Sequence, residues 1–92
     1  MEKPAFKLGK TVITRTAQAF IEKHNINVHH LMDRHHSGDC GDASEESVMA
    51  NLEAILTGKG KILSIYKLPP GEVWIMTEHD RSATTVMLPE DY

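Results

Sequence analysis

The sequence changes its pattern after Gly58, and this change constrains the fold more than any other feature. Before Gly58, apolar residues recur at the three-to-four-residue spacing of helices. After it, short runs rich in β-branched residues alternate with turns. A further β-branched run lies near the N-terminus. A strand, then helices, then strands is the order typical of an α+β domain in which helices pack on one face of a sheet.

Two to three helices are predicted in the first part of the chain. Thr16 is a candidate N-cap for a helix over 17–24, which ends at Asn25. Asn27 caps a second helix, which ends at Ser37 and Gly38. The inner face of this second helix is predicted from helical spacing to contain Val28, Leu31, Met32 and His35.

The third helix has the most regular pattern. It is predicted to begin after Asp42 or Ser44, with Glu45 and Glu46 in the first turn, where negative charge complements the helix dipole. Gly58 ends it. An amphipathic stripe is formed by Val48, Met49, Leu52, Ile55 and Leu56.

Strands are predicted over 62–68, 73–77 and 83–88, with turns at 69–71 and 79–82. Their close spacing indicates a three-stranded antiparallel meander. The β-branched segment 6–14, interrupted by Gly9, is predicted to be an N-terminal strand that could add a fourth member. With 92 residues in total, the chain is expected to form one α+β domain over 1–92.

Composition narrows the class of function. The net charge is −3 and the pI is about 6.0, which argues against broad binding to nucleic acid phosphates and favours a protein partner. No segment is long and apolar enough to cross a bilayer, and the N-terminus lacks the pattern of a secretory signal, so we expect a cytoplasmic protein with no membrane association. Cys40 is the one cysteine, so no intramolecular disulfide is possible.

The segment from Arg34 to Asp42 concentrates side chains that can exchange protons or bind ions. In it, His35 lies at the edge of an apolar helix face, where a carboxylate or arginine neighbour could tune it as an acid or base. Ser37 and Asp39 are candidate binding residues beside it. The alternative interpretation is structural, with carboxylates capping the backbone, glycines at positive φ and His35 at the boundary of the core.

The second polar cluster is the predicted turn between the last two strands. Arg81 could grip a phosphate or carboxylate in a bidentate way. Glu78 is a candidate second acid or base, and Asp80, Ser82 and Thr85 are candidate binding residues. The alternative is a solvated hairpin tip without a specific role.

A metal site is the third possibility, because helical spacing lets His29 and Asp33, or Asp33 and His36, share an ion. The chain lacks a second cysteine and a separated pair of ligand motifs, so adventitious binding is favoured over a built site. We therefore expect no metal and no cofactor. The potential ligands are His29, His30, Asp33, His35, His36, Asp39 and Cys40.

Three runs of the sequence, Arg34–Asp42, Ile62–Tyr66 and Trp74–Tyr92, resemble a family of small bacterial proteins usually labelled plasmid-related or hypothetical. The pattern in that family reads Arg-His-x-Ser-Gly-Asp-Trp-Gly-Asp, and Cys40 stands here at the tryptophan position. The resemblance implies an association with plasmids or other mobile genetic elements and makes His35, Asp39 and Arg81 the matching polar positions. It implies no particular activity.

The sequence thus supports three hypotheses. The first is a cytoplasmic accessory protein of plasmid or mobile-element origin, a monomer or weak homo-oligomer, that binds an unknown macromolecule, a protein rather than a nucleic acid. The second is a small metal-independent ribonuclease that uses His35, Arg81 and Glu78. The third is a metal-binding regulator built on the histidine cluster. The first two expect His35 and Arg81 to lie close together over a shared polar pocket.

Overall fold

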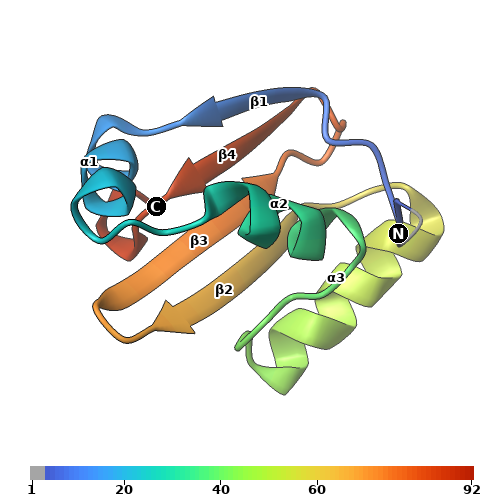
Figure 1. Cartoon of the computed structure of the whole chain (residues 1–92). Coiled ribbons are helices and arrows are strands. Elements are labelled where there is room, and N and C mark those ends of the chain that lie inside the picture. The colour runs from blue at the N-terminus through green and yellow to red at the C-terminus, as the bar shows by residue number, and fades with distance from the viewer. Residues whose placement is uncertain (1–3) are drawn as a thin grey trace.

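The computed structural model describes residues 4–92 and contains three helices, a four-stranded sheet and a terminal 3₁₀ turn (Figure 1). The α+β class predicted from the sequence is confirmed. The elements, in chain order, are β1 (Lys10–Ile13), α1 (Arg15–Lys23), α2 (Val28–His36), α3 (Glu45–Thr57), β2 (Ile62–Leu68), β3 (Gly71–Thr77), β4 (Ala83–Met87) and η1 (Pro89–Asp91).

The sheet has the strand order β1-β4-β3-β2. Strands β2, β3 and β4 form the predicted antiparallel meander, and the N-terminal strand joins it as the fourth member. Because β1 runs parallel to β4, the sheet is mixed. This places the first strand of the chain beside the last one, at the edge opposite β2 (Figure 1).

Two N-terminal boundaries differ from the prediction. Strand β1 begins at Lys10 because Gly9 turns the chain at φ 66°, pressed so closely against the β3–β4 turn that a Cβ would lie 2.3 Å from the Arg81 carbonyl oxygen. Helix α1 is capped by Thr14, whose hydroxyl accepts from the Ala17 amide, whereas the predicted cap, Thr16, donates its hydroxyl to Asp91.

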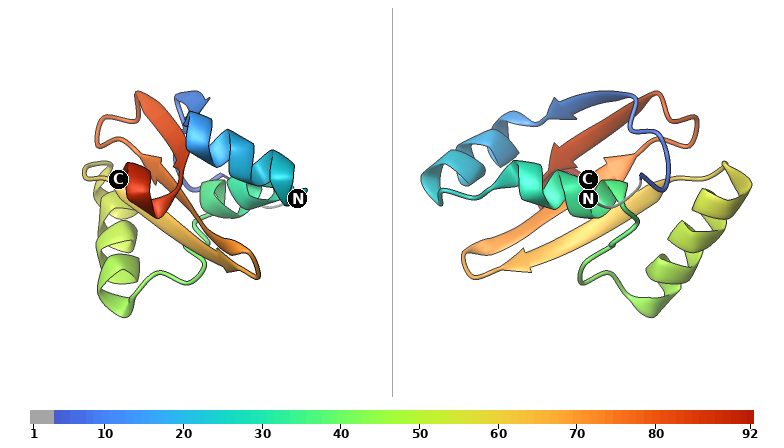
Figure 2. Two further views of the ribbon diagram at one scale, coloured as in Figure 1. Left: turned by 90° about the vertical axis from the view of Figure 1, so that its left-hand side faces the viewer. Right: turned by 45° about the vertical axis from the view of Figure 1, so that its right-hand side comes forward.

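The core lies between one face of the sheet and the helices α1 and α2, which cover that face (Figure 2). Alternate residues of each strand point towards these helices, as the period of a β-strand requires. The buried core residues are Ala17, Ile21, Leu31, Tyr66, Val73, Ile75, Val86 and Leu88.

Helix α3 lies away from α1 and α2, along the outer edge of β2 (Figure 2). Its N-cap is Ser44, one of the two predicted, and Gly58 ends it in the left-handed conformation. Only Asn51 and Ala54 of this helix are buried. An amphipathic stripe usually faces the core, but most of the stripe of α3 points to solvent.

The C-terminus is fastened to the first helix. The Asp91 carboxylate accepts from the hydroxyls of Thr16 and Thr14 and from the Leu88 amide, and these bonds lower the pKa of Asp91. Beyond it, the Tyr92 ring meets the half-buried ring of Trp74 edge-on at 5.5 Å. The C-terminal segment is therefore held against the start of α1 and against β3.

Candidate functional site

A chain of buried polar side chains starts at His35, which has 0% of its surface exposed. Its Nδ1 lies 2.6 Å from the Ser64 hydroxyl and its Nε2 lies 2.8 Å from the Thr77 hydroxyl. Thr77 is in turn 2.7 Å from the Thr84 hydroxyl, which donates to the Leu8 carbonyl at 2.7 Å. The chain links α2, the three antiparallel strands and the segment before β1.

The hydrogen positions in this chain follow from its last member. A carbonyl can only accept, so the single proton of Thr84 is used on Leu8, and Thr77 must then donate to Thr84. The Thr77 oxygen is left to accept from His35 Nε2–H, and the unprotonated Nδ1 accepts from Ser64. A neutral imidazole with its proton on Nε2 therefore gives every hydroxyl of this chain of side chains a hydrogen-bond partner.

Burial lowers the pKa of His35 to about 4, and the nearby charge of His36 adds to the effect. The centroids of the Phe6 and His35 rings lie 5.2 Å apart in an edge-to-face arrangement, so the imidazole has apolar as well as hydroxyl neighbours. In the folded protein His35 is therefore neutral at physiological pH and has no surface from which to meet a substrate. This arrangement fits a histidine that joins helix to sheet.

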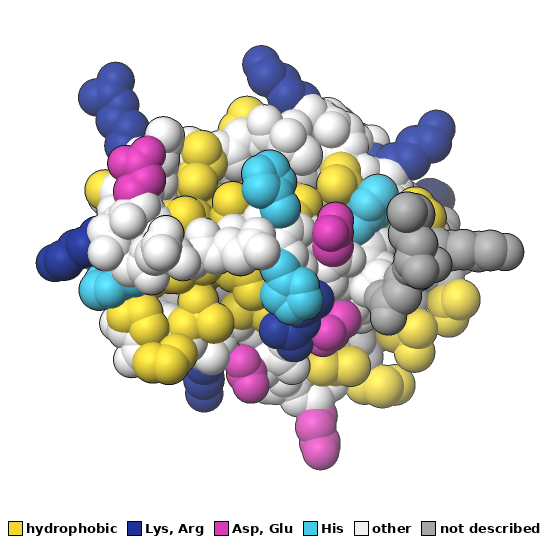
Figure 3. Space-filling model, in the orientation of Figure 1, with side chains coloured by type: hydrophobic (Ala, Val, Ile, Leu, Met, Phe, Trp, Pro, Cys, Tyr) yellow, Lys and Arg dark blue, Asp and Glu magenta, His cyan; other side chains and the backbone are white. Residues whose placement is uncertain are grey.

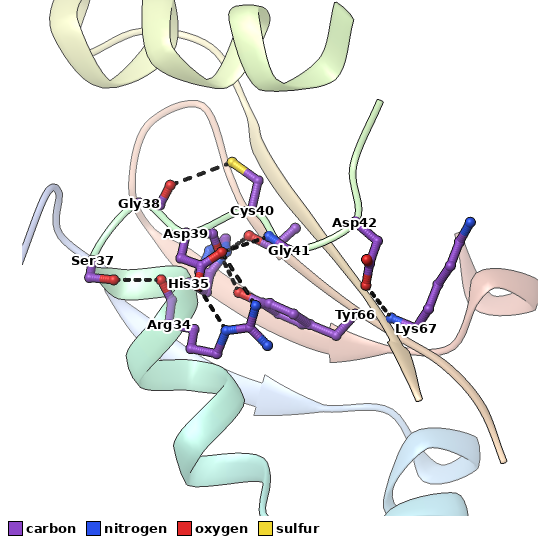
Figure 4. Close-up of polar contacts among 11 residues, drawn as sticks. Arg34, His35, Ser37, Gly38, Asp39, Cys40, Gly41, Asp42, Tyr66 and Lys67 are labelled. Carbon is purple, nitrogen blue, oxygen red and sulfur yellow. Dashed lines mark hydrogen bonds and ion pairs between the residues drawn. The ribbon is translucent and has the colours of Figure 1, made fainter. Parts of the chain in front are cut away.

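The rest of the polar segment folds back on itself and onto Tyr66 (Figure 4). Arg34 forms an ion pair with Asp39 at 2.8 Å, which lowers the pKa of the carboxyl, and its guanidinium lies 4.7 Å from the centre of the Tyr66 ring. The Tyr66 hydroxyl donates to the Asp39 carbonyl at 2.6 Å, and burial raises its pKa to about 12. Ser37 donates to the Arg34 carbonyl and closes the helix end.

The residues that follow cover the outer edge of β2. The Cys40 carbonyl accepts from the Ile65 amide, the Asp42 amide donates to the Ile65 carbonyl, and the Asp42 carboxylate accepts from the amide of Lys67. Gly41 adopts φ 65° and lies so close to β2 that a Cβ would be 2.4 Å from the Ile65 carbonyl oxygen. Only glycine fits there, since the position combines a left-handed backbone with contact to a strand.

Asn51 of α3 completes this edge. Its side-chain amide donates to the Leu63 carbonyl at 2.6 Å and accepts from the Leu63 amide at 3.0 Å, so it pairs with β2 as a neighbouring strand would. It also donates to the Cys40 sulfur. Exposed strand edges are prone to pairing with other chains, and here one asparagine and the 40–42 segment occupy the edge.

Substitution of Asn51 by alanine is expected to lower the free energy of unfolding by about 2 kcal/mol, because its two hydrogen bonds to Leu63 and the one to Cys40 are lost and both polar groups of Leu63 lose their partner. Urea unfolding measures the change. Glu53→Ala, an exposed substitution on the same helix, is the matched control and is expected to change stability by less than about 0.5 kcal/mol. Equal effects of the two substitutions would contradict the edge-pairing role.

Arg81 lies in the β3–β4 turn with φ 62°, and its guanidinium binds backbone carbonyls. Nη2 donates to Ala54 in the last turn of α3 at 2.8 Å, and Nη1 donates to Gly60 at 2.7 Å and to two carbonyls of its own turn. A cation at this position complements the negative end of the α3 dipole. The side chain thus fastens α3 to the β3–β4 turn.

The other predicted residues of this turn are dispersed. Asp80 accepts from the Ser82 amide, and the hydroxyl and amide of Ser82 lower its pKa. Glu78 contributes its backbone carbonyl to the Arg81 amide and guanidinium. Thr85 points to the sheet face opposite Thr84, because neighbours on a strand alternate, so it is not part of the buried chain.

His35 and Arg81 are joined to the same end of the sheet, where Thr77 and Thr84 flank the turn that carries Arg81. Within residues 4–92, however, the polar atoms of His35 bind strand hydroxyls and those of Arg81 bind carbonyls. The predicted polar residues are therefore largely used in holding elements together. The ribonuclease hypothesis requires both groups to face a substrate, and this geometry offers it no support.

The histidines do not gather around a common point. Across the part of the chain that the structure describes, no three side chains of the ligating types lie close enough to hold a metal ion. Cys40 is buried and accepts from Asn51. The metal-regulator hypothesis consequently gains no support from the geometry.

The sequence identified the apolar stripe of α3 but not its exposure to solvent. We call the exposed part of the stripe the α3 face; it consists of Val48, Met49, Leu52 and Leu56, whose exposed fractions are 40%, 65%, 49% and 78%. Figure 3 shows apolar side chains exposed over the region of α3, at the lower right. The sequence feature that points to this exposure is Asn51. A polar residue beside the stripe indicates that the helix contacts the sheet with another of its sides.

No protein-family model, curated protein or solved structure matches this chain. The helices within residues 4–92 are all too short or too polar to cross a bilayer.

Proposed function

We propose that this chain is an accessory protein of a bacterial plasmid or other mobile element that acts in the cytoplasm by binding a protein partner. The observation that carries the proposal is the α3 face. Four neighbouring apolar side chains on one helix are exposed, while another side of the helix is fixed to β2 by Asn51. Contiguous exposed apolar patches are typical of protein-binding surfaces.

The charge around the α3 face favours a basic protein over a nucleic acid. Exposed carboxylates of Glu45, Glu46 and Glu53 lie on the same helix, and Asp42 lies just before it. This acidic surround repels phosphates. It complements an apolar partner surface flanked by lysine or arginine. The His35 side chain is fully buried and cannot reach a substrate, which also favours binding over catalysis.

The test pairs a substitution in the α3 face with one on the same helix outside it. Met49→Asp/Leu56→Asp changes the two most exposed residues of the α3 face. Because both side chains are exposed, we expect the double variant to fold normally, but no longer to bind the partner. Ala50→Asp, also exposed but on another side of α3, is expected to retain it. Quantitative mass spectrometry of proteins captured from the bacterium that encodes the chain, followed by titration of the purified partner, measures the difference.

We expect a loss of at least about tenfold in affinity for the double variant and less than about twofold for Ala50→Asp. Equal capture by all three proteins would contradict the proposal. Concentration-dependent sedimentation of the wild type that disappears in the double variant would instead indicate that the α3 face joins copies of this chain.

A further inference from the structure

The two outer edges of the sheet differ in whether their outward-facing backbone groups have hydrogen-bond partners. The edge of β2 is closed, because the polar backbone groups of Leu63 and Ile65 and the amide of Lys67 have partners in α3 and the 40–42 segment. Strand β1 forms the other edge and, among the residues that the structure describes, pairs with β4 alone. Proteins usually protect such edges, so the unprotected one is a candidate for binding.

The register of β1 shows which of its groups face outwards. The Lys10 and Thr14 amides donate to the carbonyls of Ser82 and Val86, each at 3.0 Å, so even-numbered residues face β4. Backbone groups of consecutive strand residues point to opposite sides. The N–H and C=O of Thr11 and Ile13 therefore point away from the sheet, where no other element within residues 4–92 pairs with them.

An apolar groove lies beside this edge. It has a volume of about 260 Å³ and runs between β1 and α2, with Val86 of β4 in its floor and Val28 and Met32 of α2 in its wall. Figure 1 shows the ribbons of β1, β4 and α2, the three elements that carry the residues lining the groove. Val12 and Ile13 are 39% and 38% exposed at its margin. A strand added to β1 would place alternate side chains over the groove.

The charge at this edge is positive. Lys7, Lys10 and Arg15 are exposed before, within and after β1. The single ion pair among residues 4–92 joins Arg34 to Asp39, so none of these three cations is in one. One carboxylate, Asp91, is nearby, and its Oδ2 accepts from the hydroxyls of Thr14 and Thr16. Two copies of β1 paired edge to edge would bring these cations together, which disfavours self-association.

We propose that β1 binds an extended, acidic segment of a partner protein by strand addition. The backbone of the segment would pair with Thr11 and Ile13, alternate aliphatic side chains would enter the groove, and flanking aspartates or glutamates would meet Lys10 and Arg15. Hydrogen bonds to the backbone supply affinity, and the groove and charges supply selectivity. This site is separate from the α3 face, and either can exist without the other.

The probe is a displayed library of random ten-residue peptides, selected on the wild-type chain and followed by synthesis of the enriched sequence. We expect enriched peptides to alternate aliphatic residues with others and to carry acidic ends. In ¹H–¹⁵N correlation spectra of the wild type, the synthetic peptide is expected to shift the Thr11 and Ile13 amides and to protect them from hydrogen exchange. The amide signals of α3 are expected not to shift.

Three variants test the contacts by fluorescence anisotropy. Thr11→Pro removes one outward donor, which an edge strand tolerates, and is expected to weaken binding roughly tenfold. Lys10→Glu/Arg15→Glu is expected to weaken it by a similar factor and to relax the preference for acidic peptides. Lys67→Glu, on the opposite edge of the sheet, is the control for one charge reversal and is expected to change affinity less than about twofold.

Several results would overturn the proposal. One is the absence of enriched peptides, and another is enriched peptides whose binding is unaffected by both the proline and the double glutamate variants. Amide shifts confined to α3 would show that the peptide binds the α3 face and not β1. A wild-type dimer that Thr11→Pro dissociates would mean that β1 pairs with a second copy of this chain.

Discussion

Replacement of His35 by alanine is expected to lower the free energy of unfolding by about 4 kcal/mol. The substitution removes a buried ring and leaves the hydroxyls of Ser64 and Thr77 without their partner, which costs more than the bonds themselves contribute. A domain of this size has a total stability of about 5–15 kcal/mol. The midpoint of thermal unfolding should therefore fall by roughly 20 °C.

Urea and thermal unfolding followed by circular dichroism measure this effect. The matched control is His30→Ala, which removes an exposed imidazole from the same helix and is expected to change stability by less than about 0.5 kcal/mol. Similar unfolding curves for the two variants would show that the chain from His35 to Leu8 contributes little to stability.

Acidification is expected to destabilise the protein through the same residue. Folding lowers the pKa of His35 from 6.5 to about 4, so between these values the unfolded chain binds a proton that the folded protein does not. Stability therefore rises with pH across this range and is lost as pH falls. The loss attributable to His35 is about 2 kcal/mol between pH 7 and pH 5 and about 3 kcal/mol by pH 4.

The measurement is the free energy of unfolding at each pH for the wild type and for His35→Gln, in which the site does not titrate. The wild type should lose more stability than the variant between pH 7 and pH 5, a range in which the carboxylates whose pKa is lowered, Asp39, Asp80 and Asp91, remain charged. A proton NMR titration of the His35 ring gives its pKa directly. Parallel stability curves, or a ring that titrates near pH 6.5, would contradict the prediction.

The sequence predicted local structure well because local structure depends on neighbours. Helical spacing placed His35 with Val28, Leu31 and Met32 on the inner side of α2, and His35 and Leu31 are buried there. The strand boundaries of β2 agree with the prediction. The partners of His35 could not be predicted in the same way. Ser64 and Thr77 meet it, and Thr84 meets Thr77, only because three remote strands pair in one register.

The side of α3 that faces the sheet was the least predictable feature. Its apolar stripe satisfies the pattern of a core helix, yet the hydrogen bonds of Asn51 to the edge of β2 decide the orientation. Arg81 illustrates the same difficulty. A guanidinium in a polar turn suggests an anion site, whereas the carbonyls of Ala54 and Gly60, distant in sequence, are its ligands. Backbone acceptors leave no signal in a sequence.

The parallel pairing of β1 with β4 also constrains biosynthesis. Lys10 lies opposite Ala83, so the pairing joins segments that are far apart in the sequence, and such long-range contacts form slowly. While the ribosome is still adding residues up to Met87, the N-terminal segment has no strand to join. Premature termination anywhere before the last strand would therefore release a polypeptide whose first strand has nothing to align with.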